Sequence, residues 1–387
     1  MNSTMAIKGW LFILPWSPDA IGGINRVVIE LCRAMKLDGH YQPIILVLDW
    51  LADKPVVIEK MDYIEIRCRL RVPSNEIKAL MSFIVSLPRT LILLSNILSK
   101  YRIAVVNPHN PILSTVYFVL LRLIKVNFRL FISVHGADLK GLGGGGRIEK
   151  RLWKWIINRA DAIVACSKGL ADNFIALFPE AESKTIYIHN GISADFLSSE
   201  PNSARINILP QQYLLSVGTF EHKKGQDLLI AAFAIIAAQF PDLSLVLIGR
   251  SSDTLTLYKQ QALHAGLEQR IIFFEDIPPD DISDFYRHAS LYVSSSRDEP
   301  FGIVMLEAAA AGIPVLATRT LGAMEIIGDG VDGMLVPVDD VDALAQGITD
   351  LLNDRHKCKI YSKALKEKVI RKFTWKNALV EYMSLTN

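Results

Sequence analysis

The sequence predicts an α/β protein with two parallel β-sheets. Short apolar runs of strand length alternate with longer stretches of helical length, which is typical of βα units and parallel sheets. This alternation begins near the N-terminus and begins again in the second half of the chain, so each half is expected to form a sheet of its own. A chain of 387 residues is also too long for one typical core and suits two domains.

The predicted strands are short apolar runs that end at polar or turn residues. In the first half they cover residues 10–16, 43–49, 103–109, 129–136, 162–167 and 185–191. In the second half they cover residues 213–219, 243–249, 271–276, 291–296, 313–318 and 333–338. Helices are expected between the strands, one beginning near Asn25 and a long apolar one over Ile77 to Leu98.

The boundary between the two domains is predicted in the segment from Ser198 to Pro210, which contains several Ser, Asn and Pro residues. We therefore expect a first domain over residues 1–200 and a second over residues 205–373. Residues 374–387 have the spacing of an amphipathic helix. The four consecutive glycines Gly143 to Gly146 are expected to form a mobile loop, because glycine imposes little backbone preference.

The charge is divided unevenly along the chain. Residues 1–200 hold 24 Lys and Arg against 17 Asp and Glu, whereas residues 201–387 hold 18 against 23. A basic first half favours an anionic partner, such as lipid head groups or a phosphorylated acceptor. Ordinary variation of surface charge is the alternative interpretation.

No membrane-spanning segment or metal-binding cysteine pattern is expected. Apolar stretches approaching about 18 residues are interrupted by Pro88-Arg89 or by Arg122 and Lys125. The apolar run from Trp10 to Trp16 is short and lacks a cleavage site, so we interpret it as a first strand and not as a signal peptide. The cysteines share no ligand spacing, which favours reduced thiols in a cytosolic protein; they are Cys32, Cys68, Cys166 and Cys358.

The most informative motif follows the predicted strand that ends at Ser294 to Ser296. Glu299 lies in a short loop, Pro300 suits the first turn of a helix, and Gly302 would leave the helix entrance open. Free N–H groups at such an entrance can hold a phosphate. Glu307 lies eight residues after Glu299, within an apolar run where a carboxylate needs a partner. Two ordinary acids on a helix surface are the alternative, but the apolar context favours a functional pair.

With this E-x7-E motif, the chain resembles the retaining nucleotide-sugar glycosyltransferases of family 4. The resemblance extends from Gly22 to Trp375 and is densest between Leu214 and Pro337. It implies the GT-B fold, in which two Rossmann-like domains face each other across a cleft. It also implies that the helix over residues 374–387 crosses back to the first domain.

Several second-half positions match the family one by one. The resemblance implies that Glu299 lies against the donor sugar and that Glu307 accepts hydrogen bonds from the ribose. It places backbone amides beside the sugar and diphosphate at Phe301, Gly302, Ile303 and Val304. Lys224 matches the lysine that neutralises the diphosphate, whereas Thr219 stands where the family has an arginine. Lys223 and Arg250 are candidates to supply the missing charge.

The first half carries further matches. Gly22 and Gly23 match the family's glycine loop, where the backbone approaches the donor phosphate or the acceptor. His135 ends a strand where the family places a histidine beside the donor sugar, although a lone histidine is more often structural. Asp138 follows in the same loop as an acceptor-side candidate. Asn190-Gly191 is expected to form the turn that leaves the first domain.

These residues predict sugar transfer from a nucleotide-diphosphate sugar without a metal ion. Lys224 and the amides after Pro300 would stabilise the leaving diphosphate, and no DxD-like pair stands at a strand end. Retention is implied by the resemblance alone. The expected acceptor is a glycan or glycolipid of cell-surface polysaccharide biosynthesis, and no nucleic acid or cofactor is expected. We expect a cytoplasmic protein with peripheral contact at an anionic membrane, because basic residues alternate with apolar ones over 64–72 and 118–131.

Three other functions are considered. A dinucleotide-dependent oxidoreductase would need G-x-G-x-x-G after the first strand, but the glycines here are adjacent. A two-lobed sugar-binding protein without catalysis is usually secreted, and the sequence shows no signal peptide. A catalytically inactive nucleotide-sugar-binding protein of the same fold stays open because of Thr219.

Overall fold

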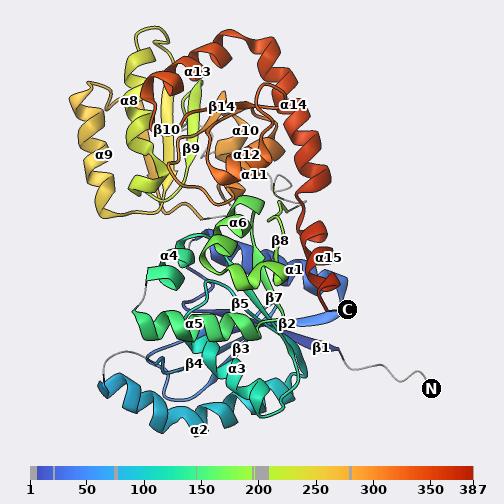
Figure 1. Ribbon diagram of the computed structural model, residues 1–387. Helices are drawn as coiled ribbons and strands as arrows, with labels where there is room; N and C mark the ends of the chain where they lie inside the picture. Colours follow the sequence, from blue (N-terminus) through green and yellow to red (C-terminus); the bar gives the residue numbers. More distant parts are fainter. Residues whose placement is uncertain are drawn as a thin grey trace. The chain divides into compact units, whose positions relative to one another are not determined.

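The structure is a computed structural model that describes residues 7–20, 22–73, 77–144, 146–193, 196, 209–278 and 281–386. Its contacts divide the chain into two compact units (Figure 1). Unit 1 comprises Met1–His189 together with Ala378–Asn387, and unit 2 comprises Asn190–Asn377. Most of the expected linker, Ser198 to Pro210, lies outside the described residues.

Unit 1 contains an eight-stranded sheet in the order β3-β4-β2-β1-β5-β6-β7-β8. Its strands are β1 (Lys8–Leu14), β2 (Tyr41–Leu48), β3 (Val56–Glu59), β4 (Ile64–Cys68), β5 (Ile103–Pro108), β6 (Arg129–Val134), β7 (Ala162–Ala165) and β8 (Thr185–Tyr187). All neighbours are parallel except β3 and β4, which pair antiparallel.

The hairpin of β3 and β4 was missed by the sequence interpretation. Residues 64–72 were expected to contact a membrane through alternating basic and apolar side chains. The structure corrects this for β4, because Ile66 and Cys68 are buried in the sheet. Arg67 pairs with the buried carboxylate of Glu65 at 2.5 Å. The alternation is therefore that of a half-buried strand.

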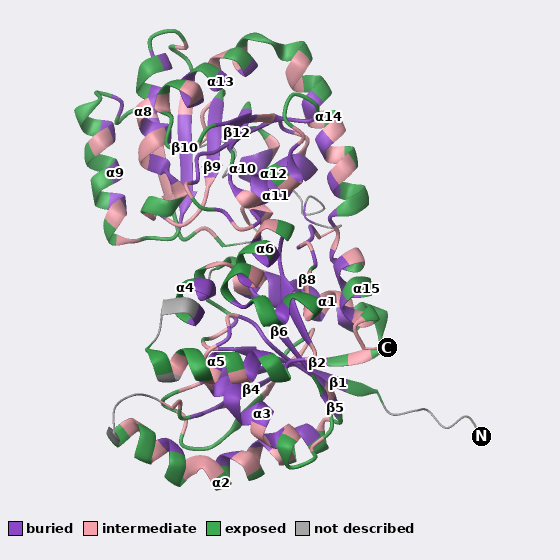
Figure 2. Cartoon of the chain, viewed as in Figure 1, coloured by how far each residue is buried: buried purple, intermediate pink, exposed green. Residues whose placement is uncertain are grey.

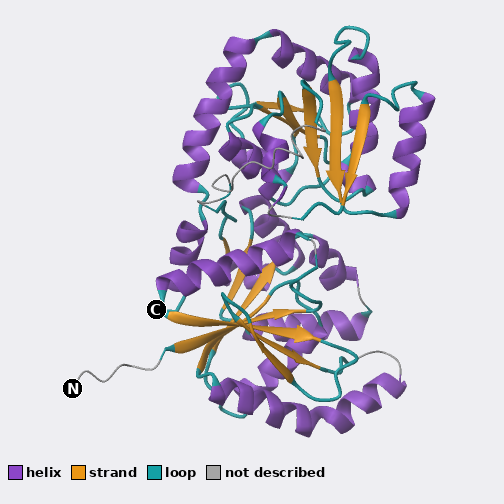
Figure 3. Ribbon diagram, turned by 180° about the vertical axis from the view of Figure 1, so that it is seen from behind, coloured by secondary structure: helices purple, strands orange, loops and turns teal. Residues whose placement is uncertain are grey.

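Helices flank the unit 1 sheet, as Figure 3 shows from behind. They are α1 (Gly23–Asp38), α2 (Ile77–Lys100), α3 (Val116–Leu123), α4 (Ala137–Gly144), α5 (Arg147–Arg159) and α6 (Lys168–Leu177), with 3-10 turns at η1 (Leu113–Thr115) and η2 (Pro179–Lys184). The prediction that Gly143 to Gly146 form a loop is partly wrong. Gly143 and Gly144 end α4, Gly146 precedes α5, and Gly145 lies outside the described residues.

Helix α2 differs from the expectation in one respect. The stretch Lys78–Lys100 is long and apolar enough to cross a membrane by length and composition, and only 22% of its most apolar window is buried. The prediction that Pro88-Arg89 breaks this apolar stretch is therefore wrong for the helix. Pro88 and Arg89 do not end the helix, which continues through them. In Figure 2 most of α2 is drawn as exposed or intermediate.

Unit 2 contains a six-stranded parallel sheet in the order β11-β10-β9-β12-β13-β14. Its strands are β9 (Tyr213–Val217), β10 (Ser244–Gly249), β11 (Ile271–Glu275), β12 (Leu291–Ser294), β13 (Val315–Thr318) and β14 (Met334–Val336). Its helices are η3 (His222–Lys224), α8 (Gln226–Ile236), α9 (Asp253–His264), α10 (Ser283–Arg287), α11 (Ile303–Ala311), α12 (Leu321–Ile326), α13 (Val341–Asn353) and α14 (Arg355–Lys372). The strands are buried between these helices (Figure 2).

Both strand orders contain a point at which the sequence order reverses. In unit 2 this point lies between β9 and β12, and in unit 1 it lies between β1 and β5. Connections leave adjacent strands there toward opposite faces, which opens a crevice at their carboxyl ends. These ends are where ligand-binding residues are expected in each unit.

The last helix, α15 (Trp375–Ser384), passes from unit 2 into unit 1. The ring of Tyr382 lies edge-on to Trp10, with centroids 6.2 Å apart, and its hydroxyl is 3.2 Å from Ser133 Oγ. The expected return of the C-terminal helix to the first domain is confirmed. Where the chain first leaves unit 1, the amide of Ile192 donates to the carbonyl of Phe373 at 2.9 Å. The two connections between the units therefore run side by side.

Candidate functional site

The loop after β9 brings Lys224 to the end of β12. Gly225 has φ +65°, and a Cβ built there would lie 2.0 Å from the carbonyl oxygen of Ser295. Only glycine fits this approach, because any other side chain would collide with backbone. The aliphatic part of Lys224 lies over Gly218, at 3.4 Å from the Cβ position of that glycine.

Glu299 and Lys224 form an ion pair in this loop region. Lys224 Nζ lies 2.5 Å from Glu299 Oε2, and Glu299 is only 8% exposed. The two residues are far apart in sequence and come together because β9 and β12 are neighbours. A ligand that binds either the Lys224 ammonium or the Glu299 carboxylate can replace the other member of this buried ion pair.

Arg297 fastens the Glu299 loop to the rest of unit 2, a role that the sequence interpretation missed. Its guanidinium makes two hydrogen bonds to Asp227 on α8, at 2.8 and 2.7 Å, and one to Asp339 at 2.5 Å. The amide of Arg297 also donates to the carbonyl of Lys223 at 2.8 Å. Such forked contacts fix geometry as well as charge. The only sequence signal was an arginine two residues before Glu299.

Glu307 is buried in α11 and has the partner that its apolar surroundings require. Tyr286, itself fully buried, donates its hydroxyl to Glu307 Oε2 at 3.0 Å. The pKa of the Tyr292 hydroxyl is raised well above its ordinary value, first by burial and then by the negative charges of Glu299 and Glu307. The two acids of the motif thus lie near the same buried tyrosine.

Helix α11 begins at Ile303, so the prediction that Pro300 occupies its first turn was wrong. Gly302 precedes the helix with φ +95°, a conformation that side chains rarely adopt. Glu307 is therefore about one turn into the helix. The first amides of an α-helix have no partner within it, and these include Ile303 and Val304. Phe301 is buried with its ring 6.0 Å from that of Phe373, and its backbone packs against Gly322.

Thr219, which stands at the arginine position, and the two candidates for the missing positive charge, Lys223 and Arg250, each have different partners. Lys223 pairs with Glu221 at 2.8 Å, and both side chains are about half exposed. Arg250 is exposed in the loop after β10, and its carbonyl accepts from the amide of Phe220. The carbonyl of Thr219 accepts from the Gln226 side chain at 3.0 Å. Thr219 and Arg250 lie in loops at the carboxyl end of this sheet, and Lys223 lies there in η3 beside Lys224.

In unit 1, Gly22 and Gly23 stand at the start of α1, after β1. No described atom lies within 4 Å of the Cβ position of either glycine, and Gly22 is extended with φ 172°. Neither the fold nor the backbone conformation therefore requires glycine at these positions. Asn25 shapes this loop: it is buried, donates to the carbonyls of Ser17 and Ala20, and accepts from Trp16 Nε1 at 2.8 Å.

His135 belongs to a chain of hydrogen bonds that the sequence interpretation did not foresee. His135 Nε2 lies 3.0 Å from His109 Nδ1, and His109 Nε2 lies 3.2 Å from Asn107 Oδ1. Asn107 in turn donates to Ser133 Oγ at 2.9 Å, and Ser133 Oγ lies 3.2 Å from the Tyr382 hydroxyl of α15. The chain links the ends of β5 and β6 to the C-terminal helix.

The donors and acceptors of this chain assign the proton positions. Asn107 Nδ2 also faces the carbonyl of Phe131, which can only accept, so Asn107 Oδ1 must accept from His109. His109 therefore carries its proton on Nε2 and accepts at Nδ1, which places the proton of His135 on Nε2. His135 Nδ1 is left as a hydrogen-bond acceptor. A ligand hydroxyl could donate to it.

Burial keeps both rings neutral. The pKa of His109 lies well below its ordinary value because of burial and then the nearby His135. Burial lowers the pKa of His135 to about 4. The proton positions assigned above require both imidazole rings, of His109 and His135, to be neutral.

Asp138 holds the His135 loop. Its carboxylate accepts from the amides of His135 and Gly136, at 2.9 and 2.8 Å. Burial raises the pKa of Asp138 to about 6, against the lowering effect of these hydrogen bonds. Asp138, which was predicted as an acceptor-side residue, therefore holds the backbone of His135 in position. Within the described part of the chain, no three His, Cys, Asp or Glu side chains gather to hold a metal ion.

Two Rossmann-like units joined by a returning C-terminal helix define the GT-B class, and the expected fold class is confirmed. Sucrose-phosphate synthase from Thermosynechococcus elongatus superimposes with a TM-score of 0.78 over 98% of both chains, at 23% identity. Residues 199–368 match the family described as glycosyl transferases group 1, and residues 21–196 match glycosyltransferase family 4. The chain belongs to this family of group 1 glycosyltransferases.

Curated relatives share part of the chain. An alpha-maltose-1-phosphate synthase from Mycolicibacterium smegmatis is 29% identical over 60% of this chain and 65% of its own length. A GDP-mannose-dependent alpha-(1-6)-phosphatidylinositol monomannoside mannosyltransferase from the same organism is 27% identical over 58% of this chain and 61% of its own. The match thus covers less than two thirds of the length of each of these two relatives.

Proposed function

We propose that this protein transfers a hexosyl group from a nucleotide-diphosphate sugar to a glycan acceptor with retention of configuration. The observation that carries the proposal is the ion pair of Lys224 and Glu299, 2.5 Å apart, at the order reversal of the unit 2 sheet. The open start of α11 and the buried Glu307 lie beside it. This is the place where an α/β sheet binds a nucleotide.

The chemistry requires stabilisation of the leaving nucleoside diphosphate. As the bond between sugar C1 and the phosphate oxygen breaks, negative charge develops on that oxygen. Lys224 can leave Glu299 and neutralise the diphosphate, while the amides of Ile303 and Val304 offer donors at a helix N-terminus. We propose that these groups suffice without a metal ion. Glu299, once released, accepts hydrogen bonds from the donor sugar.

The first unit contributes His135. Because its Nδ1 is an acceptor and its ring stays neutral, it can receive a hydroxyl of the donor sugar. Gly22 and Gly23 leave open space in which the donor or acceptor can approach the α1 backbone.

Substitution of the ion pair tests the proposal. We expect Glu299→Ala and Lys224→Ala each to reduce transfer by at least about a hundredfold, since each removes a group that acts on the transition state. Lys223→Ala is the matched control, because this exposed lysine pairs with Glu221, and it should retain activity within a few-fold. Rates are measured with the cognate nucleotide sugar, in EDTA and without it.

One competing function has a specific observation in its favour. Thr219 replaces the arginine that family members use beside the diphosphate, which suits a protein that binds nucleotide sugars without transferring them. In that case a nucleotide sugar would bind to the wild type, yet neither hydrolysis nor transfer would occur with any acceptor.

The acceptor is proposed to be lipid-linked, on the cytoplasmic face of an anionic membrane. Helix α2 supports this proposal: its exposed side chains include large apolar groups, and its sequence contains no acid. The exposed apolar side chains of α2 are Leu80, Met81, Ile84, Val85 and Ile92. Apolar groups with Lys78, Arg89 and Lys100 on one helix match an interfacial helix on anionic lipid.

Vesicle binding tests this part independently. We expect Ile84→Glu/Val85→Glu to abolish sedimentation with vesicles that contain phosphatidylglycerol, because the acids oppose both insertion and charge attraction. Leu257→Glu/Leu263→Glu on α9 is the control, since these leucines are 61% and 58% exposed in unit 2. Equal binding of both double variants would contradict the membrane proposal.

A further inference from the structure

The loop between β9 and α8 carries a backbone donor at the position where the expected arginine is missing. Thr219 stands at that position, and Lys223 is paired with Glu221 at 2.8 Å. Arg250 lies exposed in the loop after β10. A diphosphate in the proposed donor site would therefore meet Lys224 but no arginine side chain from position 219.

Gln226, the first residue of α8, holds the backbone of this loop through both protons of its side-chain amide. Its Nε2 donates to the carbonyl of Gly218 at 3.2 Å and to that of Thr219 at 3.0 Å. Because carbonyls can only accept, the orientation of the side-chain amide is determined.

The same side chain contains an acceptor that is not satisfied. Gln226 is 2% exposed, and its Oε1 is buried with no hydrogen-bond partner among the described residues. A buried acceptor without a donor destabilises the fold, and an apolar side chain at this position would avoid that cost. The two bonds to the loop are what distinguishes glutamine from such a side chain here.

The direction of the loop carbonyls determines the direction of the neighbouring amides. No peptide bond in the described chain is cis, so the C=O of one residue and the N–H of the next point to opposite sides. The carbonyl of Gly218 faces Gln226, and its oxygen lies 2.3 Å from the Cβ position of Gly249. The N–H of Thr219 therefore points away from Gln226 and Gly249.

The amides on either side of Thr219 have acceptors. Gly218 donates to the carbonyl of Ile248 at 2.9 Å. Phe220 donates to the carbonyl of Arg250 at 3.4 Å. Within the described part of the chain, the N–H of Thr219 makes no hydrogen bond. Thr219 is half-buried, so this donor belongs to a residue at the protein surface.

The Thr219 amide lies beside the lysine of the proposed donor site. The aliphatic part of Lys224 passes Gly218, with Cδ 3.4 Å from the Cβ position of that glycine, and its ammonium pairs with Glu299. Thr219 is the next residue after Gly218, at the carboxyl end of β9, where the strand order of the unit 2 sheet reverses. Backbone N–H groups in such loops bind phosphate oxygens.

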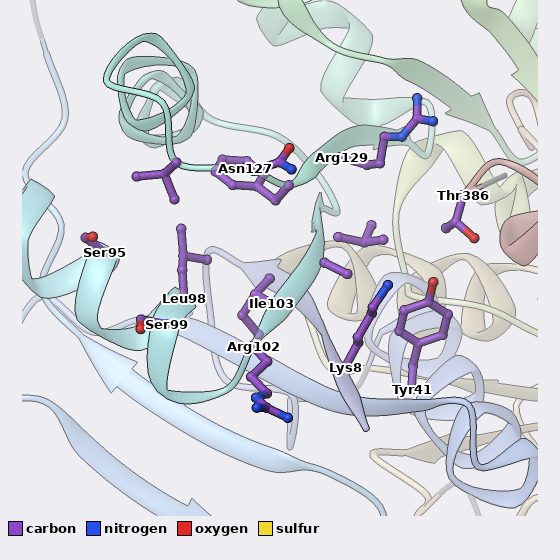
Figure 4. Close-up of a pocket in the computed structure, with 14 residues that line it drawn as sticks. Lys8, Tyr41, Ser95, Leu98, Ser99, Arg102, Ile103, Asn127, Arg129 and Thr386 are labelled. Carbon is purple, nitrogen blue, oxygen red and sulfur yellow. The ribbon is translucent and has the colours of Figure 1, made fainter. Parts of the chain in front are cut away.

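The cavity that Figure 4 shows is a separate feature of unit 1. It has a volume of about 630 Å³ and lies at the start of β1 and β5. None of its lining residues belongs to the loop between β9 and α8.

We propose that the backbone amide of Thr219, oriented by Gln226, binds the diphosphate of the nucleotide sugar in place of the arginine side chain. The amide donates one hydrogen bond to a phosphate oxygen, and Lys224 supplies the positive charge. Gln226 is a positioning residue, because it acts by holding two loop carbonyls and not by touching the ligand. This inference rests on the proposed function, and it makes threonine at position 219 compatible with transfer.

Hydrogen exchange at Thr219 tests the backbone donor directly. Wild-type protein is labelled with 15N-threonine, and the Thr219 signal is identified by its loss in Thr219→Ser, a variant used for assignment only. UDP, GDP, ADP and CDP are each added without metal, and so are the matching nucleosides. We expect the nucleoside diphosphate that binds to slow exchange of this amide at least about tenfold, because its proton becomes hydrogen-bonded. The matching nucleoside should leave the exchange rate unchanged.

Substitution of Gln226 tests the positioning role. Gln226→Met keeps the length of the side chain and removes both donor protons. We expect its affinity for that nucleoside diphosphate to fall at least about tenfold, and its affinity for the nucleoside to change less than about twofold. Gln261→Met is the matched control, because Gln261 Nε2 also bonds a backbone carbonyl, that of Asp227 in α8, at 2.9 Å. The control should keep both affinities within about twofold of wild type.

Two results would overturn the inference. Binding of a nucleoside diphosphate without slower exchange at Thr219 would show that other groups meet the phosphates. An unchanged diphosphate affinity in Gln226→Met, or an equal loss of nucleoside affinity, would show that Gln226 does not position a phosphate donor. If Gln226→Met does not fold, the exchange measurement on the wild type still decides. Absence of nucleoside diphosphate binding to the wild type would contradict the proposed function itself, so the two failures are distinguishable.

Discussion

His109 shows how one buried side chain determines what another offers to a ligand. Because it accepts at Nδ1 from His135, the free nitrogen of His135 is Nδ1. The neighbouring Asn107 is fully buried and has its amide orientation fixed by a backbone carbonyl. The proton position at His135 is thus set by a group two residues removed from it in the hydrogen-bond chain.

Replacing His109 by Phe keeps a ring of similar size but removes both hydrogen bonds. We expect His135 to populate both neutral tautomers in this variant, and transfer to fall about tenfold through lost orientation. Nitrogen NMR of 15N-histidine-labelled protein identifies the tautomer, with His135→Gln used to assign the signal. An unchanged Nε2-protonated His135 in the variant would contradict the assignment.

The same variant should change the pH dependence of stability. A histidine kept neutral in the folded protein takes up its proton only on unfolding, so stability is lost as pH falls below the ordinary pKa of about 6.5. His109 has a pKa well below that value in the fold. The stability advantage of wild type over His109→Phe should therefore shrink by about 2 kcal/mol between pH 7 and pH 5. Urea unfolding at both pH values measures it, and a constant difference would show that His109 is not buried as a neutral ring.

Tyr286 donates a hydrogen bond to Glu307, which belongs to the proposed donor site. Tyr286→Phe leaves the ring in place and removes the hydrogen bond at 3.0 Å. We expect affinity for the nucleotide sugar to fall at least about tenfold, which corresponds to loss of one hydrogen bond to a charged group, with stability lowered as well. Titration calorimetry with the cognate donor measures the change, and unaltered affinity would remove Tyr286 from the site.

Some of the roles of individual residues could be predicted from the sequence. The apolar run around Glu307 indicated a buried carboxylate that needs a partner, but Tyr286 could not be identified, because it comes from a different element. Lys224 was predicted by motif, whereas its pairing with Glu299 depends on the adjacency of β9 and β12. The chain from His135 to Tyr382 joins residues 249 positions apart at its last link, which no local pattern reveals.

At the scale of elements, turns at the strand ends decide where the functional groups lie. Twelve strands were predicted from strongly apolar runs in the sequence, because a strand that is buried on both faces is apolar along its whole length. The β3–β4 hairpin was missed because its outer strand is largely exposed, with Val56 and Val57 each 48% accessible. The start of α11 was misplaced because Gly302, and not Pro300, sets the backbone there.

Substitution of Gly225, compared with substitution of Gly266, tests how tight the turn before α8 is. Gly225 and Gly266 have φ +65° and +66°, but only Gly225 faces a backbone atom, at 2.0 Å from its Cβ position. We expect Gly266→Ala to cost about 1 kcal/mol through its backbone conformation alone. Gly225→Ala should cost several kcal/mol and displace Lys224, with loss of transfer. Thermal unfolding and activity assays separate the two, and equal effects would show that the contact with Ser295 is not tight.

At the scale of the whole molecule, two sheets with reversed strand order and a shared C-terminal helix were predicted from the restart of the βα pattern and from family resemblance. Proton positions and ion pairs depend on which strands are neighbours, so they could be identified only in the folded chain. We propose a donor site in unit 2, a histidine in unit 1 that accepts a sugar hydroxyl, and a helix α2 that contacts lipid.

We propose that unit 2 binds a nucleotide-diphosphate sugar through Lys224, Glu299 and Glu307. The most direct test is a thermal-shift and hydrolysis screen of the purified protein with UDP-, GDP-, ADP- and CMP-sugars, without added metal. We expect sugars of one nucleotide to raise the unfolding temperature and to be hydrolysed, and Glu307→Ala to lose both effects. No stabilisation by any nucleotide sugar, or equal stabilisation of Glu307→Ala, would show that these residues do not form a donor site.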